Sequence, residues 1–198
     1  MLTVGVLALQ GAFAEHIIIL NKIEGINAVP VKTVEQLEKC QALILPGGES
    51  TSIILSAQRN NLNQHIQEFI KSNKPVWGVC AGMILLSERA ERSKEGGQML
   101  FGGLDVVVKR NAFGSQIDSF TAALNITGFN DAFPGVFIRA PVIEKVGEGV
   151  EILAKLQDGR IVAVKQKNIL ATSFHPEFTG DQRFHHYFLS LINNIFNI

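Results

Sequence analysis

Residues 76–86 read VWGVCAGMILL, and this stretch decides the expected fold because a buried strand in it turns directly into a helix. We predict the strand at residues 75–79, where the apolar run is typical of a strand covered on both faces. We predict the helix at residues 81–90. The whole run falls well short of the roughly 18 apolar residues that a membrane helix needs, so we expect a chain that does not span a bilayer.

The same alternation of strand and helix precedes this stretch. The predicted strands lie at residues 2–9, 26–31 and 42–45, and the predicted helices at residues 13–23, 33–39 and 50–69. Thr33 and Gln36 form a capping box at the start of the second helix, and Asn60-Asn61 interrupts the third. Four such units predict a parallel sheet wrapped by helices, and ligands of such sheets bind beyond the carboxyl ends of the strands.

The sequence changes in character beyond residue 92, where glycine-rich turns separate β-rich runs. These runs occupy residues 104–109, 135–138, 142–146, 151–156 and 161–166. We expect them to be antiparallel strands packed on the parallel core, followed by a buried strand at residues 169–174 and an amphipathic helix at residues 181–196. The predicted fold is therefore α/β, with a mostly parallel central sheet flanked by helices and additional antiparallel strands in the second half. Without a linker or a repeat, we expect one domain over residues 1–198.

The composition excludes several classes of protein. The 198 residues carry 18 basic and 18 acidic side chains, and this zero net charge argues against a dedicated nucleic-acid binder or a polybasic membrane-surface protein. Hydrophobic residues make up 46% and charged residues 18%, which excludes a disordered chain. No basic segment precedes the first apolar run, so we read it as a strand rather than a signal peptide and expect a cytosolic protein. Cys40 and Cys80 can form neither a disulfide framework nor a paired zinc motif.

Cys80 is the first candidate for chemistry. The segment Gly78-Val79-Cys80-Ala81-Gly82 has the form of a nucleophile elbow with cysteine in place of serine, in which flanking glycines let the backbone turn sharply. At a helix N-terminus, unpaired N–H groups and the helix dipole favour the thiolate, which is the nucleophilic form of cysteine. The alternative is that Cys80 is a small buried hydrophobic residue, and the two glycines favour the nucleophile.

A cysteine nucleophile needs a base, and His175 follows the predicted strand at residues 169–174. Pro176 should hold His175 in an extended conformation, so that Glu177 projects to the same side and can orient the imidazole. Taken alone, His175 fits an ordinary histidine in a turn and Glu177 a solvated carboxylate. Together with the elbow, they form a nucleophile, a base and an orienting carboxylate in compatible positions on one sheet.

The segment Pro46-Gly47-Gly48-Glu49-Ser50 follows another strand of the predicted sheet. The backbone N–H groups of its two glycines, with that of Ala81, could form an oxyanion hole for a reacting carbonyl group. A second reading, compatible with the first, is a tight strand-to-helix turn in which Ser50 or Thr51 caps the helix. A phosphate-binding loop has little support, because neither Gly-Lys-Ser/Thr nor Gly-x-Gly-x-x-Gly follows.

The remaining cysteine and the other histidines are weaker candidates. Cys40 ends a short helix and is expected to be a core residue or an inert surface thiol. Of the adjacent His185 and His186, we expect one to pack and one to be solvated. We expect His16 and His65 on helix surfaces without partners.

Two arginines stand out from the other charged residues. Arg110 and Arg139 each interrupt an apolar stretch near a turn. An arginine in such a position is suited to hold a carboxylate. The residues alone slightly favour an ordinary surface charge at both positions.

The segments taken together resemble a known family. The elbow, the loop at residues 46–50 and His175-Pro176-Glu177 look like a class I glutamine amidotransferase domain. More narrowly, six segments are similar to the glutaminase subunits of pyridoxal 5'-phosphate synthase: Gly5-Val6-Leu7-Ala8-Leu9-Gln10-Gly11, Pro46-Gly47-Gly48-Glu49-Ser50-Thr51, Arg110-Asn111-Ala112-Phe113-Gly114, Asp118-Ser119-Phe120, Val136-Phe137-Ile138-Arg139-Ala140-Pro141 and Ser173-Phe174-His175-Pro176-Glu177. They run from the first predicted strand to the last predicted helix, and are far more specific than the elbow, which many hydrolases share.

The resemblance implies a role for each matching residue. It implies that Cys80 is the nucleophile, His175 the acid and base, and Glu177 the partner of His175. It also implies a glutamine pocket lined by Gly48, Glu49, Ser50, Arg110, Ile138 and Arg139, which reverses the reading of the two arginines as surface charges. One departure is Ser115, where relatives often carry a basic residue, but this position touches none of the catalytic ones.

The activity that the resemblance implies is hydrolysis of L-glutamine to L-glutamate and ammonia through a cysteine thioester, without a metal or an organic cofactor. Ammonia would pass to a separate synthase subunit that assembles pyridoxal 5'-phosphate. Neither a nucleic acid nor a membrane is expected as a partner. Two alternatives stay open: a γ-glutamyl hydrolase or cysteine peptidase of the same fold, and a non-catalytic regulatory subunit.

Overall fold

The computed structural model describes residues 1–91, 98–114 and 118–196. The strands are β1 (Leu2–Leu7), β2 (Ile26–Val31), β3 (Ala42–Leu45), β4 (Val76–Val79), β5 (Ser87–Glu91), β6 (Leu104–Lys109), β7 (Ser119–Leu124), β8 (Phe133–Ile138), β9 (Val142–Val146), β10 (Glu151–Lys155), β11 (Ile161–Gln166) and β12 (Ile169–Thr172). The helices are α1 (Phe13–Leu20), α2 (Val34–Glu38), α3 (Ser50–Arg59), α4 (Asn63–Lys71), α5 (Ala81–Leu86) and α6 (Arg183–Phe196), with a 3-10 turn, η1 (Pro176–Phe178), before α6. No helix among the described residues is long and apolar enough to cross a membrane.

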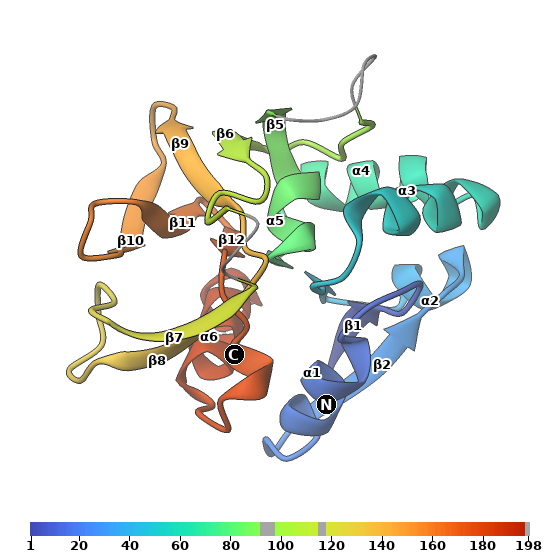
Figure 1. The fold of residues 1–198 in the computed structure, drawn as a ribbon. Helices are drawn as coiled ribbons and strands as arrows, with labels where there is room; N and C mark the ends of the chain where they lie inside the picture. The colour runs from blue at the N-terminus through green and yellow to red at the C-terminus, as the bar shows by residue number, and fades with distance from the viewer. Residues whose placement is uncertain (92–97, 115–117, 197–198) are drawn as a thin grey trace.

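The large sheet has a parallel half and a mostly antiparallel half (Figure 1). Strands β2, β1, β3, β4 and β12 are neighbours in that order, and all of them run parallel. Beyond β12 the sheet continues through β11, β9 and β6 in antiparallel pairs, and β5 is added parallel to β6 at the edge. The expected fold class is therefore confirmed. The antiparallel strands differ from expectation in one respect, because most of them extend the parallel sheet edge to edge instead of packing on it.

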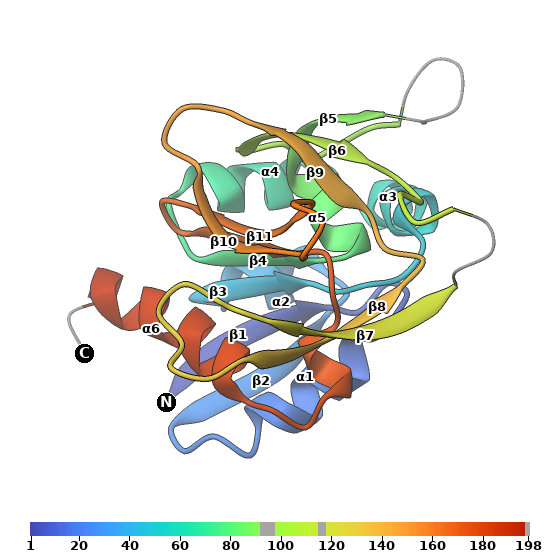
Figure 2. The same cartoon turned by 60° about the vertical axis from the view of Figure 1, so that its left-hand side comes forward.

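Helices cover both faces of the parallel half (Figure 2). Successive residues of a strand point to opposite faces, so β3 sends Leu43 and Leu45 into the core beneath α2–α5. Its other residues, Ala42 and Ile44, belong to the core beneath α1 and α6. The separate pair β7–β8 lies beside α6 in both views and adds aromatic side chains to this second core. Burial on both sides explains the continuous apolar runs of β3 and β4.

Several local predictions differ from the structure; the helix predicted at residues 13–23, for example, ends at Leu20. The helix predicted at residues 81–90 ends at Leu86, and residues 87–91 form β5 because they pair with β6, which overrides their helix propensity. Strand β7 escaped prediction because its residues are mostly exposed or half-buried and give a weak pattern. Residues 176–178 form a 3-10 turn and not an extended segment. The interruption predicted in the helix at residues 50–69 is confirmed, with Asn61 at a positive φ of 55° between α3 and α4.

Candidate active site

A cavity of about 730 Å³ lies beyond the carboxyl ends of the parallel strands. The segments after β1, β3, β4 and β12 all contribute to its wall, as expected for a ligand site of a parallel sheet. Its lining includes these residues predicted from the sequence: Gly47, Gly48, Glu49, Ser50, Cys80, Ala81, Arg110, Ile138, Arg139 and His175. Glu177 is the one predicted site residue outside the lining, and it lies behind His175.

Cys80 stands at the turn between β4 and α5 with a left-handed backbone, at φ 51° and ψ −101°. Such a conformation costs a side-chain-bearing residue about 1–3 kcal/mol and is typical of functional sites. The flanking glycines have a different role from the one expected, because neither Gly78 nor Gly82 has a positive φ. A Cβ atom at Gly82 would lie 2.0 Å from the carbonyl oxygen of Leu45, so this glycine lets α5 pack closely on β3. The sharp turn is made by Cys80 itself.

His175 and Glu177 are in direct contact. His175 Nδ1 and Glu177 Oε1 are 2.7 Å apart, and both side chains are almost completely buried. The 3-10 turn at residues 176–178, rather than an extended chain, brings Glu177 back to the imidazole. The His175 backbone N–H donates to the carbonyl of Val136 at 2.8 Å, and Phe178 stacks on the ring at 5.3 Å between centroids. The imidazole is therefore held from several sides.

The surroundings of His175 favour its charged form. Burial alone would lower the pKa of His175, but hydrogen bonding and charge attraction with Cys80 and Glu177 outweigh burial and raise this pKa to about 10. The ring is thus protonated at neutral pH. An imidazolium beside a cysteine is the arrangement that stabilises a thiolate.

The glycine loop after β3 is tied to the loop after β1. The carbonyl of Gly47 accepts a hydrogen bond from the N–H of Ala12 at 3.0 Å, and the side-chain oxygen of Gln10 accepts one from the N–H of Glu49 at 2.8 Å. Gln10 also lines the cavity. It was missed as a site residue, although its place directly after a buried strand could have indicated it. Residue 47 must be glycine because a Cβ atom there would lie 2.4 Å from the His175 ring.

The capping prediction for α3 is wrong. The N-cap of α3 is Glu49, which makes no side-chain capping bond, and Ser50 is the first helical residue. The Ser50 hydroxyl instead donates to the side-chain oxygen of Gln98 at 3.2 Å. Ser50 is therefore turned toward the cavity wall and away from its own helix end.

Both arginines line the cavity, with Arg110 half-buried and Arg139 exposed. Arg110 donates to the Gln98 side-chain oxygen at 2.9 Å, and its other terminal nitrogen is 3.4 Å from the Glu49 carboxylate. Arg139 has a positive φ of 41°, and its backbone N–H donates to the carbonyl of Asp118 at 2.7 Å. The cavity lining therefore contains two arginines, Arg110 and Arg139, and two acidic residues, Glu49 and Asp118, besides Cys80. Ser115 lies outside the described residues.

The expectations for the other cysteine and histidines have mixed outcomes. Cys40 is a core residue, and burial raises its pKa to about 11, so it stays a thiol. His185 is buried and His186 exposed, as predicted. His65 lies on the surface within 4.0 Å of Glu68. The prediction for His16 is wrong, because this side chain is fully buried, 3.0 Å from His185 and 3.5 Å from Glu177.

The buried position of His16 had a signal in the sequence. His16 precedes Ile19 and Leu20 by three and four residues, which is the spacing of one helix face, and all three are buried. Its partner His185 could not be inferred, because it is 169 residues away in the chain. Within the described residues, no group of three or more His, Cys, Asp or Glu side chains is arranged to hold a metal ion.

Comparison with known proteins gives a consistent result. Residues 6–194 match the SNO glutamine amidotransferase family. A Dehalococcoides mccartyi protein named pyridoxal 5'-phosphate synthase subunit PdxT is 50% identical over 189 residues, which cover 95% of this chain and 96% of the relative. A Herpetosiphon aurantiacus protein of the same name is 51% identical over 191 residues, covering 96% and 100% of the two chains. A solved structure of a glutamine amidotransferase, 46% identical, superposes with a TM-score of 0.88 over 96% of this chain and 98% of that one.

Proposed function

The chain belongs to the SNO glutamine amidotransferase family, and on this premise we propose that it is the glutaminase subunit of a pyridoxal 5'-phosphate synthase. The proposed reaction converts L-glutamine and water to L-glutamate and ammonia. One observation carries the proposal: Cys80 and His175 share one cavity at the carboxyl ends of neighbouring parallel strands, and Glu177 contacts the imidazole from behind at 2.7 Å. The site thus combines a nucleophile, a residue that can act as acid and base, and a carboxylate that orients this residue.

In the first half of the reaction, the Cys80 thiolate attacks the side-chain amide carbon of glutamine. A C–S bond forms, and the amide oxygen becomes an oxyanion that the backbone N–H groups of Gly47, Gly48 and Ala81 would stabilise, with ~100- to 1000-fold in rate for each donor. The His175 imidazolium donates its proton to the amide nitrogen. The C–N bond then breaks, ammonia leaves, and a thioester on Cys80 remains.

In the second half, His175 is neutral and acts as a base. It takes a proton from water, whose oxygen attacks the thioester carbon. The C–S bond breaks, L-glutamate leaves, and the thiolate and imidazolium are restored. Glu177 stabilises the charged ring whenever it forms, which is the function of a carboxylate in this position.

The charged groups around the cavity fit the ends of a free amino acid. We assign Arg110 and Arg139 to the α-carboxylate of glutamine, because guanidinium groups bind carboxylates with paired hydrogen bonds. We assign Glu49, whose carboxylate lies 3.4 Å from Arg110, to the α-amino group. Binding of both free α groups distinguishes the proposal from a peptidase, whose substrates carry an amide bond at one of these groups. A γ-glutamyl peptide keeps both α groups free, so a γ-glutamyl hydrolase is distinguished by the substrate test below.

The protonation of ammonia in water explains why the chain would need a partner subunit. Ammonia released into water at neutral pH is protonated and loses its nucleophilicity, so a closed path to the acceptor is of advantage. The relatives are named as subunits of pyridoxal 5'-phosphate synthase, and we infer that a synthase subunit docks over this cavity and receives the ammonia. We expect the complex in the cytosol, where the free cysteines Cys40 and Cys80 stay reduced.

The test is the rate of glutamate formation by the purified chain with and without a synthase subunit. We expect glutamine hydrolysis that increases when the synthase subunit is added, and incorporation of amide nitrogen from ¹⁵N-glutamine into the cofactor. Release of an amino acid from γ-glutamyl peptides in preference to glutamine would instead support a γ-glutamyl hydrolase. Cofactor synthesis from glutamine by a Cys80→Ala complex would support a non-catalytic subunit.

A further inference from the structure

Glu177 contacts His175 through only one of its two carboxylate oxygens. Oε1 lies 2.7 Å from the imidazole, whereas Oε2 is buried and has no hydrogen-bond partner among the described residues. Buried polar atoms in native proteins almost always have a partner. A buried carboxyl oxygen without one points to a donor that completes its bonding during turnover.

His16 of α1 lies where such a donor is needed. Its Nε2 is 3.5 Å from Glu177 Oε2, and neither side chain is accessible to solvent. The ring packs edge-on against Trp77 of β4, at 5.4 Å between centroids, which limits its rotation. Hydrogen bonds in free active sites are often long and shorten when substrate binds, so a separation of 3.5 Å is compatible with a donor to Glu177.

His185 of α6 completes the line behind His16. His185 Nε2 is 3.0 Å from His16 Nδ1, and the His185 ring also packs edge-on against Trp77, at 5.1 Å. The Trp77 indole N–H donates to the Thr172 hydroxyl at 3.1 Å, so it is engaged elsewhere. The two imidazoles therefore form a buried line that ends at Glu177.

The positions of the protons follow from this line. A neutral imidazole has one donor nitrogen and one acceptor nitrogen. If His185 Nε2–H donates to His16 Nδ1, then His16 carries its proton on Nε2, which faces the carboxylate. The opposite assignment would turn a lone pair of His16 toward a negatively charged oxygen. The first arrangement leaves His185 Nδ1 as an acceptor without a proton, in agreement with its lack of a hydrogen-bond partner in the part of the chain that the structure describes.

The charge state of both rings is consistent with this assignment. Burial, and then the nearby His185 and His175, hold the pKa of His16 well below 6.5. Burial and His186 lower the pKa of His185 to about 3. The titratable groups that face His16 are His185 from α6 and His175 and Glu177 from the segment after β12. Both rings thus stay neutral at physiological pH.

We propose that His16 and His185 are positioning residues, which hold the Glu177 carboxylate by a hydrogen bond from His16 Nε2 to Oε2 so that its other oxygen orients His175. The inference rests on the proposed function. Neither histidine lines the cavity, so they act on the reaction only through Glu177. We therefore expect them to affect the rate of the chemical step and not the binding of glutamine.

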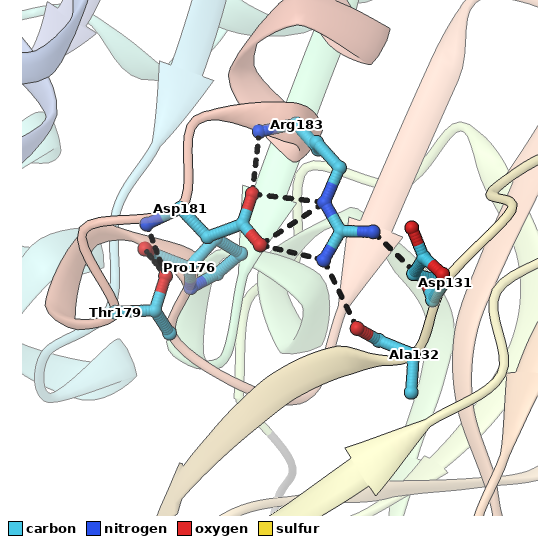
Figure 3. Close-up of polar contacts among 6 residues, drawn as sticks. All are labelled: Asp131, Ala132, Pro176, Thr179, Asp181 and Arg183. Carbon is cyan, nitrogen blue, oxygen red and sulfur yellow. Dashed lines mark hydrogen bonds and ion pairs between the residues drawn. The ribbon is translucent and has the colours of Figure 1, made fainter.

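A polar network fixes the turn that carries Glu177 against the start of α6, which carries His185 (Figure 3). Its members are Asp131, Ala132, Pro176, Thr179, Asp181 and Arg183. The Arg183 guanidinium is 2.6 Å from the Asp181 carboxylate and donates to two backbone carbonyls before β8, at 2.9 and 3.0 Å. The Thr179 hydroxyl accepts from the Asp181 N–H at 3.1 Å and donates to the Pro176 carbonyl at 2.8 Å. The separation between Glu177 and α6 is thus held by side chains as well as by the backbone.

The first test measures glutamine hydrolysis as a function of pH in the complex with the synthase subunit. The variants are His16→Leu/His185→Leu, which removes both rings together, His16→Gln, whose amide can donate from near the Nε2 position, and His186→Leu, an exposed control on the same helix. In the double variant we expect kcat to fall about 10- to 100-fold with KM unchanged. We expect the basic limb of the pH profile to move to lower pH by about one unit, because the His175 imidazolium loses support.

Rescue by His16→Gln and a measurement of stability distinguish a positioning role of the two histidines from a loss of folded structure. His16→Gln should recover most of kcat, and His186→Leu should behave as the wild type. All rates are compared at a temperature where urea unfolding shows each variant to be fully folded. A folded double variant with wild-type kcat and pH profile would overturn the inference. A wild-type complex that does not hydrolyse glutamine would instead overturn the proposed function.

The second test observes the protons directly and does not depend on activity. Long-range ¹H–¹⁵N NMR spectra of the ¹⁵N-labelled chain distinguish the two neutral tautomers of histidine from the cation. We expect His16 and His185 to be protonated on Nε2 alone between about pH 5 and pH 9. A His16 ring protonated on Nδ1, or charged at pH 7, would contradict the proposed line of donors.

Discussion

The parallel strands of the large sheet contribute to the site differently from two other strands. These are β6, in the mostly antiparallel half of the same sheet, and β8, in the separate β7–β8 pair. Strands β3, β4 and β12 are buried along their whole length, and the glycine loop, Cys80 and His175 come after them. Strands β6 and β8 alternate between buried and more exposed residues, and Arg110 and Arg139 follow their ends. The groups proposed to react thus stand on strands covered on both faces. The two arginines proposed to bind the α-carboxylate follow strands that are covered on one face, whereas Glu49, proposed to bind the α-amino group, follows β3.

This difference has a physical reason. A reacting constellation must be held to within about half an ångström, and side chains locked by packing on every side achieve this best. A carboxylate bound by long arginine side chains tolerates more movement, because the guanidinium can follow it. The comparison predicts that changes at Cys80 and His175 affect the rate of reaction, whereas changes at Arg110 and Arg139 affect the binding of glutamine.

The largest effect is expected at Cys80. Cys80→Ala should lower the glutamine hydrolysis rate by at least ~1000-fold, since it removes the atom that forms the thioester. The measurement is glutamate release by the complex. Cys40→Ala removes the other buried thiol from the same half, far from the cavity, and should keep most of the activity. Comparable losses of activity in Cys80→Ala and Cys40→Ala would contradict the role given to Cys80.

The next largest effect is expected at Arg110, which follows β6. Arg110→Ala should raise KM for glutamine by about 10- to 100-fold, because a charge-assisted hydrogen bond contributes about 1.5–3 kcal/mol. Steady-state kinetics should show a smaller change in kcat. Arg59→Ala, an exposed arginine at the end of α3, is the control. A loss confined to kcat in Arg110→Ala would assign this arginine to the chemical step.

A third effect concerns stability, and not activity, as a function of pH in the parallel half. The pKa of His175 is about 10 in the folded chain and near 6.5 when unfolded, so the folded state binds the proton more tightly. Its contribution to the free energy of unfolding is fully present below pH 6.5 and is lost as pH rises toward 10, by up to ~1.4 kcal/mol per pH unit. Urea unfolding of the wild type and His175→Gln should therefore converge over this range. A difference that stays constant with pH would contradict the raised pKa.

The smallest effect is expected on the outer strands. Lys165 on β11 and Glu151 on β10 are 3.1 Å apart, and both side chains are partly exposed. Glu151→Gln should cost less than about 1 kcal/mol of unfolding free energy and leave glutamine hydrolysis unchanged. A substantial loss of activity would show that these strands support the site more directly than the comparison allows.

Much of the parallel half could be predicted from sequence because its signals are local. Strands β2 and β3 have the predicted bounds, and β3 is a continuous apolar run of the kind typical of strands buried on both faces. The Thr33–Gln36 capping box is present as predicted, because all its atoms lie within one turn. The cavity contains the predicted cysteine and histidine for the same reason, since each follows a strand that could be recognised.

What could not be predicted depends on partners distant in the chain. Residues 87–91 are good helix formers, and only their pairing with β6 makes them a strand. His16 was expected on a helix surface, because its neighbours His185 and Glu177 come more than 150 residues later. The strain on Cys80 could not be inferred either, since the adjacent glycines offered the easier positions for a sharp turn.

The central place of β12 has a consequence for how the chain folds during synthesis. Trp77 of β4 bonds to Thr172 of β12 across 95 residues, and until β12 emerges from the ribosome β4 has an unpaired edge. An open, apolar strand edge is prone to pair with other chains. We therefore expect the nascent protein to depend on chaperones until β12 is inserted, and Cys80 to remain without its base until the same moment.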